Sequence, residues 1–472
     1  MDYQRKGAAT VFELGLGLSS YVPYVMYGAG IVAFLLSVFW RPIVGIYYLV
    51  PLIPLQEARY HLNVFPLGKS VVDIMLLGVV LGLLVRGQSI FPKTPWNFLL
   101  CVYAMFTFAS LCQGSFSLHV PLPFSPDDVR LAAWKNYMVM PMILSLVAAT
   151  VKEPREMKIV IALMCLGTLL LDRSFWTTVS GRDFSSFSYD LQDNGSMGYA
   201  GVNGLATFEA QVSVFLLALT AFERRRLLQL GYIALAIFSA RCLMYSLSRE
   251  GYLAFLGGCL FLGLVKQRKL LVLLAVFACT WSSLVPTAVE QRVNMTYDKN
   301  DGRLDHSSQV RVDLWEEGLQ LFSENPTLGL GFGTYAHTNH AHGYSDSHNI
   351  YMKVLVETGI VGLLLFLCLL AKTFWTGYEL FRHAQDPFLG SLGLGLAGWL
   401  LCSGIASFFG DRWTFLQING YMWVLGGMVS QAWVLQRSAA PPQYNMFERN
   451  STDAKEALEL EPAAVLSTST CC

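Results

Sequence analysis

The chain has 472 residues, of which 54% are apolar and 14% are charged, with 33 basic side chains balanced by 33 acidic ones. A soluble domain carries about 25% charged residues, so lipid rather than water must surround much of this chain. The zero net charge gives no reason to expect a nucleic acid as partner. The ten cysteines include no CxxC pair, which argues against a disulfide framework or a cysteine zinc site.

Long apolar segments recur along the chain, and each predicts a membrane-spanning helix because backbone polar groups cannot stay unpaired in hydrocarbon. The first apolar stretch is too continuous for a cleavable signal, so we predict a retained membrane segment. We expect twelve or thirteen spans, with residues 11–55 open to more than one arrangement. The expected spans are 23–40, 42–55, 71–85, 96–113, 134–151, 157–171, 205–222, 227–247, 250–265, 270–286, 348–371, 388–408 and 414–435.

Loop charge predicts which ends of the spans face the cytoplasm. Alternation places four short basic loops on one side, which the positive-inside rule assigns to the cytoplasm. These loops are 152–158, 223–226, 266–269 and 372–382. The loops 114–133, 172–204 and 287–347 then share the opposite side.

The predicted fold class is an all-α polytopic membrane protein with one long periplasmic loop. Residues 1–286 hold the N-terminal spans, 287–347 form the loop, and 348–435 hold the C-terminal spans. The polar tail 436–472 has a composition typical of a disordered cytoplasmic segment.

The loop 287–347 departs most clearly from lipid-like composition. Apolar residues recur at helical spacing between 308 and 323, which predicts an amphipathic helix that ends at Asn325-Pro326. The glycines of GLGFG (329–333) follow no strand, so they are no dinucleotide fingerprint. They predict a tight turn where the loop folds back toward the membrane.

Two arginines are candidate anion ligands. Arg249, in SLSREGYLAF, lies at the loop-side end of a span, where it fits either a snorkelling anchor paired with Glu250 or a ligand for phosphate. Arg311, in QVRVDLWEEG, fits either a surface ion pair with Asp313 or Glu316 or the same phosphate. Both lie on one side of the membrane, so they can converge on one group.

His348, in DSHNIYMKVL, marks the junction of loop and span. An imidazole titrates near neutral pH and can accept a proton from an attacking hydroxyl, with Asp346 near enough in sequence to orient it. A histidine at such a boundary also fits a purely structural hydrogen bond. His337, His340 and His342 add spacings that zinc ligands use, so the residues alone leave a metal site open.

Three motifs taken together resemble the O-antigen ligase and polymerase superfamily, bacterial membrane glycosyltransferases that act on undecaprenyl-diphosphate-linked glycans. The resemblance is strong over roughly 200–370. The motifs are Arg249 with Leu253, then Arg311 and Trp315 leading to Pro326 and GLGFG, then His348-Asn349 with Gly359 and Gly362.

The resemblance implies a GT-C-like fold and a role for each candidate. Arg249 and Arg311 would hold the donor diphosphate and stabilise the charge that develops as it leaves. His348 would activate the acceptor hydroxyl or assist the leaving phosphate, and Asn349 and Asn203 would bind substrate. Transfer would invert the anomeric centre without a metal or cofactor, because arginines take the place of the cation. The additional histidines lie outside the family pattern.

We therefore predict a glycosyltransferase that moves a glycan from undecaprenyl diphosphate to a hydroxyl of the lipid A core or of a growing polysaccharide. It would serve lipopolysaccharide or exopolysaccharide biosynthesis at the periplasmic face of the inner membrane. The alternative is a flippase or transporter of lipid-linked oligosaccharides, which predicts charged residues deep inside several spans. Glu209 is the main such candidate, and it lies near the end of its predicted span.

Overall fold

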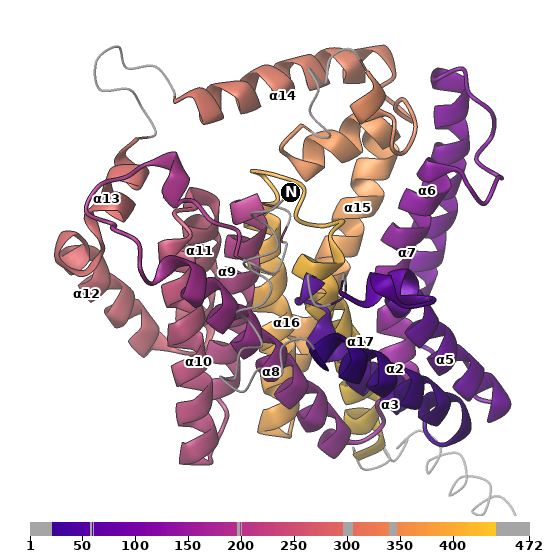
Figure 1. The fold of residues 1–472 in the computed structure, drawn as a ribbon, viewed down its shortest axis with the longest axis horizontal. Coiled ribbons are helices and arrows are strands. Elements are labelled where there is room, and N and C mark those ends of the chain that lie inside the picture. Colours follow the sequence, from indigo (N-terminus) through magenta and orange to yellow (C-terminus); the bar gives the residue numbers. More distant parts are fainter. Residues whose placement is uncertain are drawn as a thin grey trace, which may run out of the picture. The chain divides into compact units, whose positions relative to one another are not determined.

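The computed structural model describes residues 21–439 apart from 57, 58, 60, 196–198, 200, 296–304 and 339–346. Every regular element in these residues is a helix, so the chain is an all-α polytopic membrane protein as predicted (Figure 1). Two compact units are distinguished, Met1–Ala432 and Trp433–Cys472. The described part of the second unit is the last turns of α17.

Each predicted span overlaps a helix. Before the long loop these helices are α2 (Val22–Phe39), α3 (Ile43–Leu52), α5 (Val71–Val85), α6 (Asn97–Ser117), α7 (Val129–Thr150), α8 (Pro154–Val179), α9 (Gly201–Thr220), α10 (Arg226–Tyr245), α11 (Arg249–Val265) and α12 (Arg268–Leu284). After the loop they are α15 (Ile350–His383), α16 (Pro387–Ala406) and α17 (Leu416–Ala439).

Fewer helices than the twelve or thirteen expected spans are long enough to cross a membrane by length and composition. Within the described residues, nine helices are long and apolar enough to cross a membrane, or ten if the bent pair of α12 and α13 (Thr287–Asn294) counts as one span. The clearest difference is at 42–55, where α3 has ten residues. About 20 residues are needed to cross the hydrocarbon core, so α3 cannot cross it alone.

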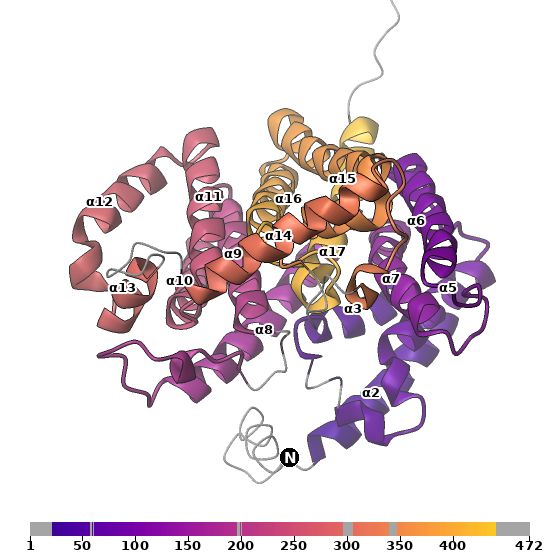
Figure 2. The ribbon, with the colours of Figure 1, turned by 90° about the horizontal axis from the view of Figure 1, so that it is seen from above.

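Helices α9 and α16 form the centre of the first unit. α9 packs against α10, α11 and α16, and α16 packs in turn against α11 and α15. Most residues of both helices are buried. By contrast α12 has one buried residue, Leu270, and lies at the edge of the bundle beside α11 in both views (Figures 1 and 2).

The predicted loop helix is α14 (His306–Glu324), which lies across one end of the bundle (Figures 1 and 2). Asp305 caps its first turn by accepting from the Ser308 amide, and Asn325 ends it as expected. Trp315 donates from Nε1 to the Ser347 carbonyl oxygen at 3.1 Å, which ties α14 to the start of α15.

The glycine-rich turn after α14 docks against the kink of α15. Gly359 interrupts α15 with φ 64°, and the freed backbone of that helix accepts from Leu330 and Gly331 at 3.0 and 2.7 Å. Gly331 has φ 119°, and a Cβ there would lie 2.2 Å from the Gly114 Cα atom. The predicted tight turn is confirmed, and close backbone approach requires glycine at 329 and 331.

Candidate active site

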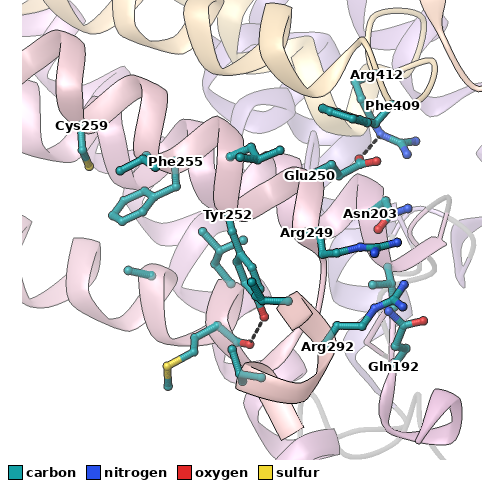
Figure 3. Close-up of a pocket in the computed structure, with 18 of the residues that line it drawn as sticks. Gln192, Asn203, Arg249, Glu250, Tyr252, Phe255, Cys259, Arg292, Phe409 and Arg412 are labelled. Atoms are coloured by element: carbon teal, nitrogen blue, oxygen red, sulfur yellow. Dashed lines mark hydrogen bonds and ion pairs between the residues drawn. The ribbon is translucent and has the colours of Figure 1, made fainter. Parts of the chain in front are cut away.

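A cavity of about 1460 Å³ opens among α9, α10, α11, α12, α13 and α14 (Figure 3). Its lining on α11 runs from Arg249 to Cys259, which is about 15 Å at 1.5 Å per residue. Most of the wall is apolar, with side chains that include Ile237, Leu253, Leu256, Leu273, Phe277 and Trp281. The cavity therefore joins a polar end beside the long loop to an apolar slot along the spans.

Arg249 begins α11 at this polar end. Its Nη2 atom donates to Asp305 Oδ2 at 2.8 Å, and its side chain keeps 19% of its surface exposed. Asn203 at the start of α9 also lines the cavity, and its Oδ1 atom accepts from Ser248 Oγ at 2.7 Å, one residue before Arg249. Asn203 thus holds the turn that presents Arg249.

Arg292 on α13 is a second guanidinium in the cavity, and sequence reasoning did not select it. Its Nη1 atom lies 3.8 Å from Asp305 Oδ2. Its Cζ atom lies 5.1 Å from the ring centre of Phe187 and 5.4 Å from that of Tyr189. The side chain is 8% exposed, yet Nε has no hydrogen-bond partner in the part of the chain that the structure describes. A buried guanidinium with an unsatisfied donor favours an anion.

Arg412, in the connection between α16 and α17, is a third cation that sequence reasoning missed. Its Nε atom donates to Glu250 Oε1 at 2.7 Å, and both side chains are buried (Figure 3). Asp411 holds this connection by accepting from the amides of Trp413 and Thr414 and from Lys353 Nζ. The cation is therefore fixed in place by contacts outside the cavity.

Arg311 on α14 completes the cationic end. Its Nη1 atom donates to the Ser307 carbonyl and hydroxyl oxygens at 2.9 and 2.8 Å, and Nε donates to the Phe409 carbonyl oxygen at 3.4 Å. These partners are neutral, unlike the surface carboxylates that the sequence also allowed. Asp313, one of those carboxylates, instead accepts from Gln309.

His348 lies in the cavity wall, which Arg311 and Trp315 also line. Its φ of 51° is in the left-handed region, which costs a residue with a side chain energy unless neighbours hold it there. On one side Trp315 donates to the Ser347 carbonyl, and on the other Asn349 caps α15 by accepting from the amides of Tyr351 and Met352. The flanking residues therefore determine where the imidazole lies.

The predicted site residues thus meet, with one exception. Arg249, Arg311, His348 and Asn203 line the same cavity, whereas Asn349 is not among its lining residues. The Asn349 side chain is 8% exposed and its oxygen is used by the helix cap. We infer that Asn349 positions His348.

The charges at the polar end do not balance. Among the described residues, four arginines face two carboxylates, Asp305 and Glu250, and a fifth lining arginine, Arg241, stacks on Trp176. The cavity therefore has an excess of three positive charges. Burial opposes ionisation of Asp305, but hydrogen bonds from Ser308 and Arg249 outweigh it, so its pKa lies below the usual value. Burial lowers the pKa of Arg311, and so do the charges of Arg249 and Arg412. The cavity is suited to an anion with more than one negative charge.

A metal is not needed to explain these contacts. The described residues contain no group of three or more His, Cys, Asp or Glu side chains able to hold a metal ion. His337 is described, in the short helix Tyr335–His337, and is not a lining residue of the cavity. His340, His342 and Asp346 lie outside the described residues, so metal independence stays a prediction.

The fold and cavity define a polytopic membrane protein with a cationic, amphipathic cavity. Residues 212–367 match the family model described as O-antigen ligase, which confirms the resemblance to the superfamily in this part of the chain. An O-antigen ligase of Pseudomonas aeruginosa is 28% identical over 139 residues, which is 28% of this chain and 33% of that relative. The match therefore spans a third of the relative's length.

Proposed function

We propose that the protein transfers a glycan from a polyprenyl-diphosphate carrier to an acceptor hydroxyl. One observation carries the proposal: the cavity combines four arginines and a histidine at one end with an apolar slot along α10, α11 and α12. A lipid-linked diphosphate needs both parts, because its phosphates require cations and its chain requires an apolar surface.

Each residue then has a chemical task. The acceptor oxygen attacks the anomeric carbon while the bond from that carbon to the phosphate oxygen breaks, and the bonding electrons leave with the diphosphate. Arg249, Arg292 and Arg311 offset the charge that builds up on it. His348 takes the proton of the hydroxyl as the new bond forms. Attack from the face opposite the leaving group inverts the anomeric centre.

The membrane face follows from loop charge. The cavity's polar end lies beside α14, opposite the basic connections between α9 and α10 and between α11 and α12. These basic connections favour the cytoplasm, so we place the site at the periplasmic face of the inner membrane.

The transporter alternative has one observation in its favour. Asp172 and Glu209 are carboxyl residues buried within helices, as a transporter would require. Neither is among the residues that line the cavity. A lipid-linked substrate in the cavity would therefore not contact them, and we prefer glycosyl transfer.

The test is transfer by purified protein in nanodiscs with an undecaprenyl-diphosphate-linked glycan. Arg249→Ala, Arg311→Ala and His348→Ala should each lower turnover by about 10²–10³. Arg268→Ala, which removes an exposed arginine at the opposite end of α12, should retain wild-type turnover. A single product with lipid A core indicates a ligase, and a ladder of repeat units indicates a polymerase. Equal turnover in all four variants would exclude the site.

A further inference from the structure

Two carboxyl side chains lie inside the helical bundle, away from the cavity. Asp172 on α8 is seven residues before the end of that helix, and Glu209 on α9 is eight residues after its start. At 1.5 Å per residue, each is about 10–12 Å from its helix end. Both side chains are fully buried. Both residues lie at the edges of the predicted spans 157–171 and 205–222. The helices extend further than these apolar segments, since α8 continues to Val179 and α9 begins at Gly201.

The two carboxyl groups are neighbours, and α10 closes the site. Ser239 Oγ donates to Asp172 Oδ2 at 2.6 Å, and Cys242 Sγ contacts the Asp172 carbonyl oxygen at 3.6 Å. Asp172 Oδ1 and both carboxyl oxygens of Glu209 have no hydrogen-bond donor among the described residues. Three buried carboxyl oxygens of this pair therefore lack a donor among the described residues.

Among the described residues, no cation forms an ion pair with either carboxyl group. α3 and α16, which pack against α8 and α9, carry no charged residue. Glu250 of α11 pairs with Arg412, and Arg241 of α10 stacks on Trp176, 4.0 Å from its ring centre. Cys242 and Tyr199 face the pair and are neutral near pH 7, and the charged Arg59 lies near Tyr199.

An unpaired carboxylate inside a membrane protein is costly, and two adjacent carboxylates repel each other as well. A proton on Glu209 removes one charge and provides a donor for Asp172 Oδ1. The Asp172 carboxyl then accepts from Ser239 at one oxygen and from Glu209 at the other. One proton thus satisfies two of the three oxygens without any movement of the helices.

We propose that Asp172 and Glu209 form a proton-binding site that joins α8, α9 and α10. Helix α10 connects this site to the cavity, because one of its faces contacts Asp172 and another lines the cavity. Ser239 and Cys242 contact Asp172, while Ala240 and Met244 line the cavity. Loss of the proton would place two charges between these helices and loosen the α10 wall. The proposal does not depend on the chemistry assigned to the cavity.

The direct test is infrared difference spectroscopy on the purified full chain in nanodiscs at pH 7. The wild type should show the C=O stretch of a protonated carboxylic acid, shifted in ²H₂O, and Glu209→Gln should lack it. Glu156→Gln is the matched control, because that buried carboxyl is paired with Arg41. It should leave the band unchanged. If Glu209→Gln does not fold, wild-type protein with ¹³C-labelled glutamate should shift the band instead.

Thermal unfolding across pH gives the second readout. The wild type should lose on the order of a few degrees of melting temperature as alkaline pH removes the proton, whereas Glu209→Gln should melt at an almost constant temperature. Absence of the acid band, or parallel pH profiles, would overturn the proposal. So would stabilisation by Na⁺ over K⁺ at fixed pH and ionic strength, since the occupant would then be sodium.

Discussion

Under the proposed function, Asp305 competes with the substrate phosphate for Arg249. Its Oδ2 atom lies 2.8 Å from Arg249 and 3.8 Å from Arg292. Asp305→Asn removes the negative charge but keeps an oxygen that can cap α14, since asparagine is as good a helix cap as aspartate. The substitution should therefore test charge without disturbing the fold.

The expected gain in anion affinity follows from these distances. Two unit charges about 4 Å apart interact by about 4 kcal/mol at an effective dielectric constant of about 20. Because Arg249 is 19% exposed, solvent screens part of this energy. We expect about 1.4–2.8 kcal/mol, so Asp305→Asn should bind inorganic pyrophosphate roughly 10–100-fold more tightly than wild type.

The assay is calorimetric titration of pyrophosphate into protein in nanodiscs. Asp313→Asn is the control, because it removes an exposed carboxylate from the same helix and should leave affinity unchanged. If Asp305→Asn bound pyrophosphate no more tightly than Asp313→Asn, the arginines would not form the anion site.

The lowered pKa of Asp305 gives a second test, which concerns stability. The contribution of the Asp305 carboxylate to the free energy of unfolding is present above about pH 3.9 and is lost as pH falls through the folded-state pKa. The wild type and Asp305→Asn should therefore converge in melting temperature in acid.

Further outcomes follow from other parts of the structure. Arg412→Gln should destabilise the fold by about 3 kcal/mol, because Glu250 would stay buried without its partner, and Arg412→Gln/Glu250→Gln should recover most of that loss in thermal unfolding. Turnover should survive a chelator, and His337→Ala should remain active; loss of activity that zinc restores would show a metal site instead. An impermeant thiol reagent should label Gln309→Cys from outside the cell and spare Lys269→Cys, in a background lacking accessible thiols. The reverse pattern would place the cavity at the wrong membrane face.

The helices were predictable because burial in lipid or in the bundle leaves a local signature, a run of apolar residues. The ends of the helices were less predictable, since protein neighbours rather than lipid can cover polar residues there. Asp172 shows this: Ser239 on α10 donates a hydrogen bond to its carboxyl group inside the bundle, and α8 continues to Val179. The apolar composition of 42–55 likewise predicted a span, whereas α3 in this segment has ten residues.

The site was predictable only where residues belong to motifs. Arg249, Arg311 and His348 could be selected because each lies in a short pattern shared with a known superfamily. Arg292 and Arg412 lie in no such pattern and look like ordinary charges beside spans. Their place in the cavity depends on how α13 and the connection after α16 pack against α11, which is information about tertiary structure.

A structure with an undecaprenyl-diphosphate-linked glycan bound would test the proposed site without relying on turnover. The diphosphate should lie within hydrogen-bond distance of Arg249 and Arg311, with Asp305 displaced from Arg249. The anomeric carbon should face His348, and the prenyl chain should lie along Leu256 and the other apolar residues of the cavity. A lipid bound outside this cavity, with the Arg249–Asp305 ion pair intact, would show that the site is wrongly assigned.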